Sequence, residues 1–241
     1  MLISSYQAEK LINIRYIKTV NSGKHAALNI AFSDEDAKEW VFVVDSDDYL
    51  SIDCIDVLVT EIKSLPKNYH SIRIMQVDKS NVPHNNYFPN GLLNYLDLKN
   101  SGAKNDNADV FRKTALDGFK FPVFKGENFM AEGPLYNWLG LSGSTKFLNF
   151  KGYISEYLVD GLSDRSIMNR HRCFNSTLYL YENQYMCTQL KSIYKHKSAV
   201  NWWRFRMFKG PLERDFVMPI YYLPLGFALY LIDKVKNKVN N

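Results

Sequence analysis

The chain has 241 residues, of which 46% are hydrophobic and 23% charged, and it carries a net charge of +5. These values are ordinary for a globular protein, and they exclude a disordered chain, a collagen-like chain and a polytopic membrane protein. Three scattered cysteines are too few for a disulfide scaffold or a Cys-X-X-Cys metal site, so we expect them to be reduced.

The positive charge is concentrated at the C-terminal end. From residue 191 onward there are ten Lys and Arg residues and three acidic residues, so this part carries +7 and the preceding part −2. Nucleic acid is therefore not expected as a partner, because a nucleic-acid-binding surface more often spreads across a fold as a stripe. The N-terminus lacks a basic start followed by a long apolar run, so no signal peptide is expected.

The first third of the chain alternates between predicted strands and predicted helices. Residues 12–16 alternate between apolar and polar types and predict a strand, and residues 24–32 follow an Asn-Ser-Gly turn and predict a helix. The apolar run at residues 40–44 predicts a strand buried on both faces. A stripe at positions 55, 58, 59 and 62 predicts the next helix, and residues 71–77 read as a strand. This order favours an α/β fold with a mainly parallel sheet.

Later elements are less regular. Residues 81–109 are polar and predict surface loops around one short apolar segment. Pro134 suits the first turn of a helix that continues to Gly140. Aromatic residues around Phe147 and Tyr153 predict two further strands.

Three carboxylates, Asp45, Asp47 and Asp48, directly follow the apolar run at residues 40–44. The carboxyl end of a strand is where ligands bind in open α/β sheets. Carboxylates this close repel one another, and Mg²⁺ and Mn²⁺ prefer such oxygen ligands, so a divalent cation is expected here. The plainer alternative is a polar turn in which Asp48 or Ser51 caps the next helix.

Two superfamilies place carboxylates at such a strand end. Haloacid-dehalogenase-like phosphatases require Thr or Val where this chain has Tyr49, and no later acidic pair follows a strand, so this remains a distant alternative. The GT-A glycosyltransferases use the aspartates to hold a metal on a nucleotide-sugar diphosphate.

Four segments together resemble the family 2 glycosyltransferases. They are the Asn-Ser-Gly-Lys-His-Ala-Ala-Leu-Asn segment at residues 21–29, the aspartates at 45–48, the Lys-Gly-Glu-Asn-Phe-Met-Ala-Glu segment at 125–132 and the Tyr-Leu-Val-Asp-Gly-Leu-Ser segment at 157–163. The last two are similar to segments of bacterial members that build surface polysaccharides. The resemblance extends over residues 10–185 and rests on the order and spacing of all four segments.

The resemblance implies a GT-A-like (Rossmann-like) α/β fold with a mainly parallel sheet flanked by helices. It also implies transfer of a sugar, with inversion, from a nucleotide-diphosphate-sugar donor to a saccharide or lipid-linked acceptor, assisted by Mg²⁺ or Mn²⁺. Lys24, Asn29, Asp45 and Asp47 match positions that bind the nucleotide-sugar. Asp45 and Asp47 would bind the metal, and Asp47 would be its principal ligand and act in catalysis.

Glu132 matches the acidic position that supplies the general base. The base takes the proton of the acceptor hydroxyl as that oxygen attacks the anomeric carbon. The family usually has Glu-Asp here, whereas Gly133 follows in this chain, so Glu127 stays open as a second choice.

The front of the chain departs from the family pattern. The first strand of the family and its first nucleotide-binding motif have no counterpart before Ile14, so we expect an N-terminally truncated domain that binds nucleotide-sugar poorly. The alternative function is therefore that of an inactive relative acting as a membrane-associated binding or assembly module.

The C-terminal tail has a different character from the rest. We divide the chain into a glycosyltransferase domain at residues 1–200 and a helical, basic, aromatic-rich amphipathic tail at 201–241. Residues 216–232 are mostly apolar but contain two prolines, so an interfacial segment is favoured over a spanning helix. We therefore expect a cytoplasmic protein that is peripheral on the inner face of the cell membrane.

Overall fold

The computed structural model describes residues 6–7, 9, 12–103, 107–156, 166–207 and 215–239. Its strands are β1 (Trp40–Phe42), β2 (Tyr49–Leu50), β3 (Tyr69–Val77), β4 (Asn107–Arg112) and β5 (Ser144–Ile154). Its α-helices are α2 (Lys24–Phe32), α3 (Cys54–Ser64), α4 (Tyr95–Ser101), α5 (Gly133–Ser142), α6 (Ser166–Arg172), α7 (Phe174–Met186), α8 (Ser192–Arg206) and α9 (Leu223–Val239). Two short 3₁₀ helices are η1 (Lys113–Leu116) and η2 (Ile220–Tyr222).

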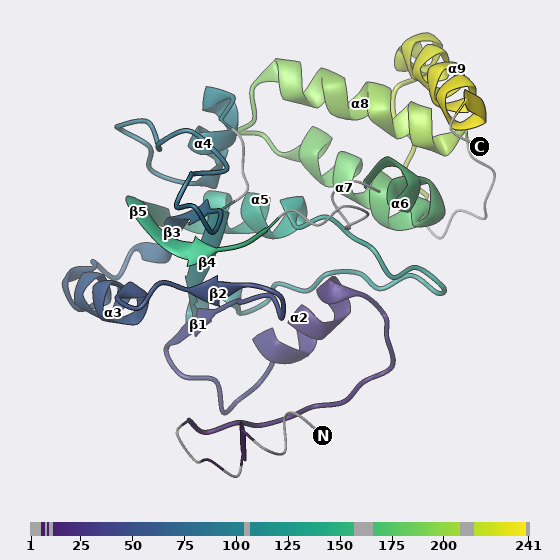
Figure 1. Cartoon of the computed structure of the whole chain (residues 1–241). Coiled ribbons are helices and arrows are strands. Elements are labelled where there is room, and N and C mark those ends of the chain that lie inside the picture. The colour runs from purple at the N-terminus through teal and green to yellow at the C-terminus, as the bar shows by residue number, and fades with distance from the viewer. Residues whose placement is uncertain are drawn as a thin grey trace.

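The strands form one sheet in the order β1-β4-β3-β5-β2, and helices lie on both sides of it (Figure 1). The predicted α/β fold with flanking helices is thus confirmed. The sheet is mixed, however, because β3 and β5 are parallel while the other three neighbouring pairs are antiparallel. The prediction of a mainly parallel sheet is wrong, because β4 lies between β1 and β3 and is antiparallel to both.

Side chains alternate between the two faces of the sheet, as strand geometry requires. On one face Ile72, Ile74 and Val110 pack against Cys54 and Leu58 of α3. The opposite face packs against α2 and α5 in a second cluster. Its members include Leu28, Phe32, Phe111, Phe121, Leu135 and Leu139. The sheet therefore has a core on each side, and the ends of its strands remain available for a site.

Several predicted elements differ in detail. The strand predicted at residues 12–16 is not formed, because these residues pair with no described strand of the sheet. The strand predicted at 40–44 is only half-buried, since β1 lies at the edge of the sheet. Helix α3 buries Cys54 and Leu58 but exposes Ile55 and Val59 of the predicted stripe. The prediction was partly wrong because apolar stripes overlap on this helix, and the sequence does not show which one faces the sheet.

The C-terminal helices α7, α8 and α9 form a layer of their own, in which α7 packs on α5, α8 on α7 and α9 on α8 (Figure 1). The boundary expected at residue 200 falls inside α8, whose Trp202 and Phe205 are fully buried together with Leu178 of α7. The start of the tail is thus part of a core. Within the described ranges, no helix has both the length and the apolar character needed to cross a membrane.

Candidate active site

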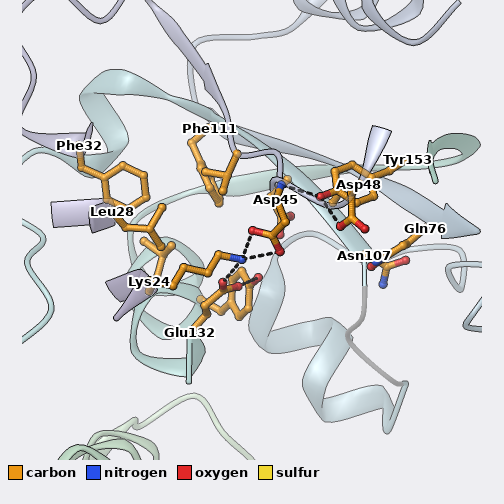
Figure 2. A pocket seen from close by; sticks show the side chains of 15 residues that line it. Lys24, Leu28, Phe32, Asp45, Asp48, Gln76, Asn107, Phe111, Glu132 and Tyr153 are labelled. Carbon is orange, nitrogen blue, oxygen red and sulfur yellow. Dashed lines mark hydrogen bonds and ion pairs between the residues drawn. The ribbon is translucent and has the colours of Figure 1, made fainter. Parts of the chain in front are cut away.

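A pocket with a cavity volume of about 70 Å³ opens where β1, β3 and β5 have their carboxyl ends (Figure 2). Its walls come from α2, the turn after β1, the strands β3, β4 and β5, and the first turn of α5. The polar residues that line it are Lys24, Asp45, Asp48, Gln76, Asn107, Asp109, Glu132, Tyr136 and Tyr153. The sheet edge that the sequence indicated as a ligand site therefore carries a polar pocket.

Lys24 joins two carboxylates that are far apart in the sequence. Its Nζ lies 2.8 and 3.0 Å from the two carboxylate oxygens of Asp45 and 3.0 Å from Oε1 of Glu132. Burial disfavours the charged form of Lys24, but the negative charges of Glu132 and Asp45 outweigh this effect and raise its pKa. Three residues predicted to act together, Lys24, Asp45 and Glu132, thus meet in one ion-paired cluster (Figure 2).

The lysine is placed by the start of α2. Gly23 precedes the helix with a φ of +88°, a left-handed conformation that glycine adopts without steric cost. A side chain at Gly23 would collide with the backbone carbonyl of Asn128. The glycine therefore lets α2 approach the 125–132 segment, which brings Lys24 to Glu132.

The aspartate turn is fixed from β5. The backbone N–H of Asp45 donates to the hydroxyl oxygen of Tyr153 over 3.0 Å, and the same hydroxyl donates to Oδ2 of Asp48 over 2.7 Å. Burial first, and then repulsion from Asp47 and Asp45, raise the pKa of Asp48. Asp47 is exposed and is not among the residues that line the pocket.

Glu132 sits at the N-terminal cap position of α5, where the positive end of the helix favours a carboxylate. Its Oε2 accepts a 2.7 Å hydrogen bond from Tyr136, one helical turn further on. Burial acts to raise the pKa of Glu132. The charges of Lys24 and Arg73 and the hydrogen bonds from Tyr136 and Lys24 outweigh burial, so the pKa is lowered. Glu132 is therefore an ionised carboxylate that faces a pocket.

Glu127 has a different environment. It is 7% exposed, and its two carboxylate oxygens accept hydrogen bonds of 2.8 and 2.7 Å from the backbone N–H groups of Asn175 and Ser176. These groups belong to the first turn of α7, so Glu127 caps that helix. Both of its oxygens are engaged by backbone, which makes Glu132 the better placed of the two glutamates for proton transfer.

Asn29 is also engaged by backbone. Its amide accepts from the N–H and donates to the carbonyl of Phe121, both over 2.8 Å. It lines a separate groove between α2 and residues 113–123 and does not line the pocket of Lys24. The sequence could not reveal this role, because a structural asparagine and a ligand-binding asparagine fit the same motif.

Four residues that lie in or behind the pocket were not predicted from the sequence. Tyr136, Tyr153 and Asp109 read as ordinary helix and strand residues. Arg73 is the exception in retrospect, because a charge within the apolar strand at residues 71–77 is unusual. The segment predicted at residues 157–163 lies outside the described residues.

The donor set at the aspartate turn suits a hard cation. Asp45, Asp47 and Asp48 offer carboxylate oxygens, and repulsion from Asp47 and Asp45 adds to the effect of burial in raising the pKa of Asp48. Within the described part of the chain, no three His, Cys, Asp or Glu side chains gather closely enough to hold a metal by themselves. A cation at this turn would therefore need ligands from the substrate as well, as Mg²⁺ commonly does with phosphates.

Comparison with known proteins supports the family resemblance. No curated protein was found to match the chain. Residues 2–118 match the family described as Glycosyl transferase family 2, which confirms the resemblance predicted from the sequence.

Solved structures of S. aureus TarS are similar in fold. Residues 1–349 of TarS match with a TM-score of 0.54 at 13% identity, over 86% of this chain and 58% of that one. The same fragment in complex with UDP-GlcNAc matches with a TM-score of 0.56 at 12% identity, over 86% and 59% of the two chains. This chain thus has the GT-A fold and spans a little over half the length of those fragments.

Proposed function

Because residues 2–118 match glycosyl transferase family 2 and the fold is of the GT-A type, we propose that the chain is a nucleotide-sugar-dependent glycosyltransferase. It would transfer a sugar to a saccharide or lipid-linked acceptor in cell-surface polysaccharide biosynthesis. The observation that carries the proposal is the Lys24 ion pair with Asp45 and Glu132 inside one pocket. Solved TarS structures contain UDP-GlcNAc and UDP, which makes these two compounds suitable probes.

On the donor side, Lys24 is the mobile cation. It would exchange its contacts with Asp45 and Glu132 for the diphosphate of the donor, since a primary ammonium binds phosphate as a point charge. Asp45 and Asp47 would hold Mg²⁺ or Mn²⁺, whose charge offsets the negative charge that develops on the leaving diphosphate. Asn29 would support this side by clamping α2 to Phe121.

On the acceptor side, Glu132 is the general base. Its lowered pKa keeps it ionised near neutral pH, so it can accept the proton of an acceptor hydroxyl. The acceptor oxygen then forms a bond to the anomeric carbon while the bond from that carbon to the diphosphate breaks. Attack from the face opposite the leaving group inverts the anomeric configuration.

The test is release of UDP from UDP-GlcNAc by the whole chain with Mn²⁺, in which water can serve as the acceptor. Loss of a general base lowers turnover by about 10²-fold or more, so Glu132→Gln should fall by that factor. The matched control is Glu156→Gln, which removes an exposed carboxylate that pairs with Lys79 away from the pocket. Equal rates for Glu132→Gln and the wild type would refute the assignment.

A binding module without catalysis is the second candidate. It is favoured by the outer edge of β1, which no described strand pairs with, and by residues 12–23, which are mostly exposed and form no helix or strand. An incomplete sheet next to the aspartate turn should weaken binding of the nucleotide. Calorimetric titration with UDP and Mn²⁺ separates the candidates: a sub-millimolar Kd favours the enzyme, and no detectable binding favours the module.

The membrane part of the proposal rests on α9. Its inner face packs on α8, where buried Asp233 accepts hydrogen bonds of 2.7 and 2.6 Å from Arg204. Its outer side and the adjoining η2 expose several large apolar side chains. These residues are Ile220, Tyr221, Leu225, Phe227, Leu231, Ile232 and Val235. Exposed Lys234 and Lys236 flank them, which suits the surface of an anionic bilayer.

Flotation with vesicles that contain anionic lipid tests this part. We expect Leu225→Glu and Ile232→Glu together to abolish binding, because both face outward and neither contributes to the buried cluster. Deleting residues 201–241 would be a poorer test, since it also removes buried Trp202 and Phe205. Unchanged flotation of the double variant would exclude α9 as the membrane contact.

A further inference from the structure

A fully buried arginine lies behind the pocket. Arg73 of β3 has 0% exposure, and its NH1 is 3.4 Å from Oδ2 of Asp109 on β4. Burying this charge pair is costly, and an apolar pair of similar size would often serve stability as well. The pair therefore calls for an explanation beyond packing.

The guanidinium of Arg73 packs against two tyrosine rings that also contact each other. Its central carbon is 4.8 Å from the ring centroid of Tyr136 and 5.2 Å from that of Tyr95. The two rings are themselves 5.0 Å apart, and the Tyr95 hydroxyl donates to Oδ1 of Asp109 over 2.9 Å. The ring of Tyr136 is thus held by cation–π and aromatic contacts on its buried side.

The other end of Tyr136 reaches Glu132. Its hydroxyl donates to Oε2, while Lys24 contacts Oε1, so the two carboxylate oxygens have separate partners. The two partners differ in mobility. The ammonium of Lys24 ends a flexible chain that is 42% exposed, whereas Tyr136 is fixed by Arg73 and Tyr95.

We propose that Tyr136 and Arg73 are positioning residues that hold Glu132 ionised and in place when Lys24 leaves it for the donor diphosphate. This inference rests on the proposed function of the pocket. Without the hydroxyl of Tyr136, the carboxylate of Glu132 would lose both of the side-chain contacts described above once Lys24 leaves. This loss would come at the step in which Glu132 must accept a proton. Arg73 acts through Tyr136 and through its positive charge behind the carboxylate.

The charged and titratable groups that face Glu132 come from every element around it. They are Lys24 of α2, Asp45 of the turn after β1, Arg73 of β3, Asp109 of β4 and Tyr136 of α5. Asp109 balances Arg73, and its own pKa is raised to about 6, first by burial and against the effect of Arg73. Besides Lys24, the charge of Arg73 behind Tyr136 also lowers the pKa of Glu132.

Tyr136→Phe tests the inference because it keeps the ring on Arg73 and removes only the hydroxyl. We expect kcat for UDP release to fall about tenfold or more with KM for UDP-GlcNAc unchanged, since a hydrogen bond to a charged group is lost. The control is Trp138→Phe on the same helix, which removes a hydrogen bond to Ala115 on the far side from Glu132. An unchanged kcat in Tyr136→Phe, or a loss of the same size in Trp138→Phe, would overturn the proposal.

A second readout does not require turnover. In the chain labelled with ¹³C-glutamate, the acid titration of the Glu132 carboxyl should shift upward by about one pH unit in Tyr136→Phe. The paired variant Arg73→Met with Asp109→Asn, which leaves neither charge unpaired, should shift it in the same direction. If the wild type releases no UDP but these shifts occur, the proposed function fails, and only the support of the ionised Glu132 by Tyr136 and Arg73 stands. Unchanged titration of Glu132 in both variants would overturn the inference.

Discussion

Glu127 and Glu132 are only five residues apart, and the structure predicts opposite consequences for their removal. Glu127→Ala deletes the carboxylate that accepts from the backbone N–H groups of Asn175 and Ser176. Because Glu127 is only 7% exposed, the two donors lose a largely buried acceptor. A hydrogen bond to a charged group contributes about 1.5 kcal/mol or more, so two of them imply a loss of about 3 kcal/mol in the free energy of unfolding.

For a chain of this length, about 3 kcal/mol corresponds to a fall in Tm of roughly 6–12 °C. Thermal melts followed by circular dichroism, together with urea titrations, measure both quantities. Glu127→Gln keeps one acceptor oxygen and should lose about half as much. Glu132→Gln should stay within about 1 kcal/mol of the wild type, because its contacts lie at a pocket open to water.

The reasoning about the two glutamates would be refuted if Glu127→Ala melted like the wild type while Glu132→Gln was the destabilised variant. In that case Glu127 would return as a candidate base, and the cap of α7 would have to come from another group.

Further predictions concern the cluster and its supports. Asp109→Asn leaves the buried charge of Arg73 without its carboxylate and should lower the free energy of unfolding by about 3–5 kcal/mol in urea titrations; a loss below about 1 kcal/mol would contradict the buried pair. Gly23→Ala forces a side chain into the left-handed region and against Asn128, so we expect a loss of about 1–3 kcal/mol and weaker UDP binding by calorimetry, whereas unchanged values would argue against the close approach of α2. The lowered pKa of Glu132 means that its ionised form stabilises the fold above the ordinary value of 4.5, and this contribution disappears as the pH falls through the lowered pKa. In Lys24→Met the pKa of Glu132 should be less depressed, so the loss in urea titrations from about pH 3 to 6 should be smaller and should end at a higher pH. An identical pH dependence would contradict the ion pair.

The residues that meet in the pocket were predicted in two ways. The end of an apolar strand marks Asp45, whereas Lys24 and Glu132 were chosen because their segments resemble those of the family 2 glycosyltransferases. Their contact depends on the packing of α2 against the 125–132 segment, which the sequence does not state.

Residues that support the site from behind could not be chosen in this way. Tyr136 and Tyr153 have the pattern of core aromatics, and only the fold reveals that their hydroxyls point to carboxylates. The same limit affected α3, where two apolar stripes overlap and packing selected Cys54 and Leu58. The edge position of β1 was also hidden, because hydrophobicity does not tell which strands lie beside one another.

The most direct test of the account is UDP release from millimolar UDP-GlcNAc with Mn²⁺, measured for the wild type and Glu132→Gln alongside UDP titrations of both. The account predicts that the substitution lowers the rate by about 10²-fold or more while the Kd for UDP stays the same. Equal rates in the two proteins, or release that continues undiminished when Lys24, Asp45 and Glu132 are all replaced, would contradict it.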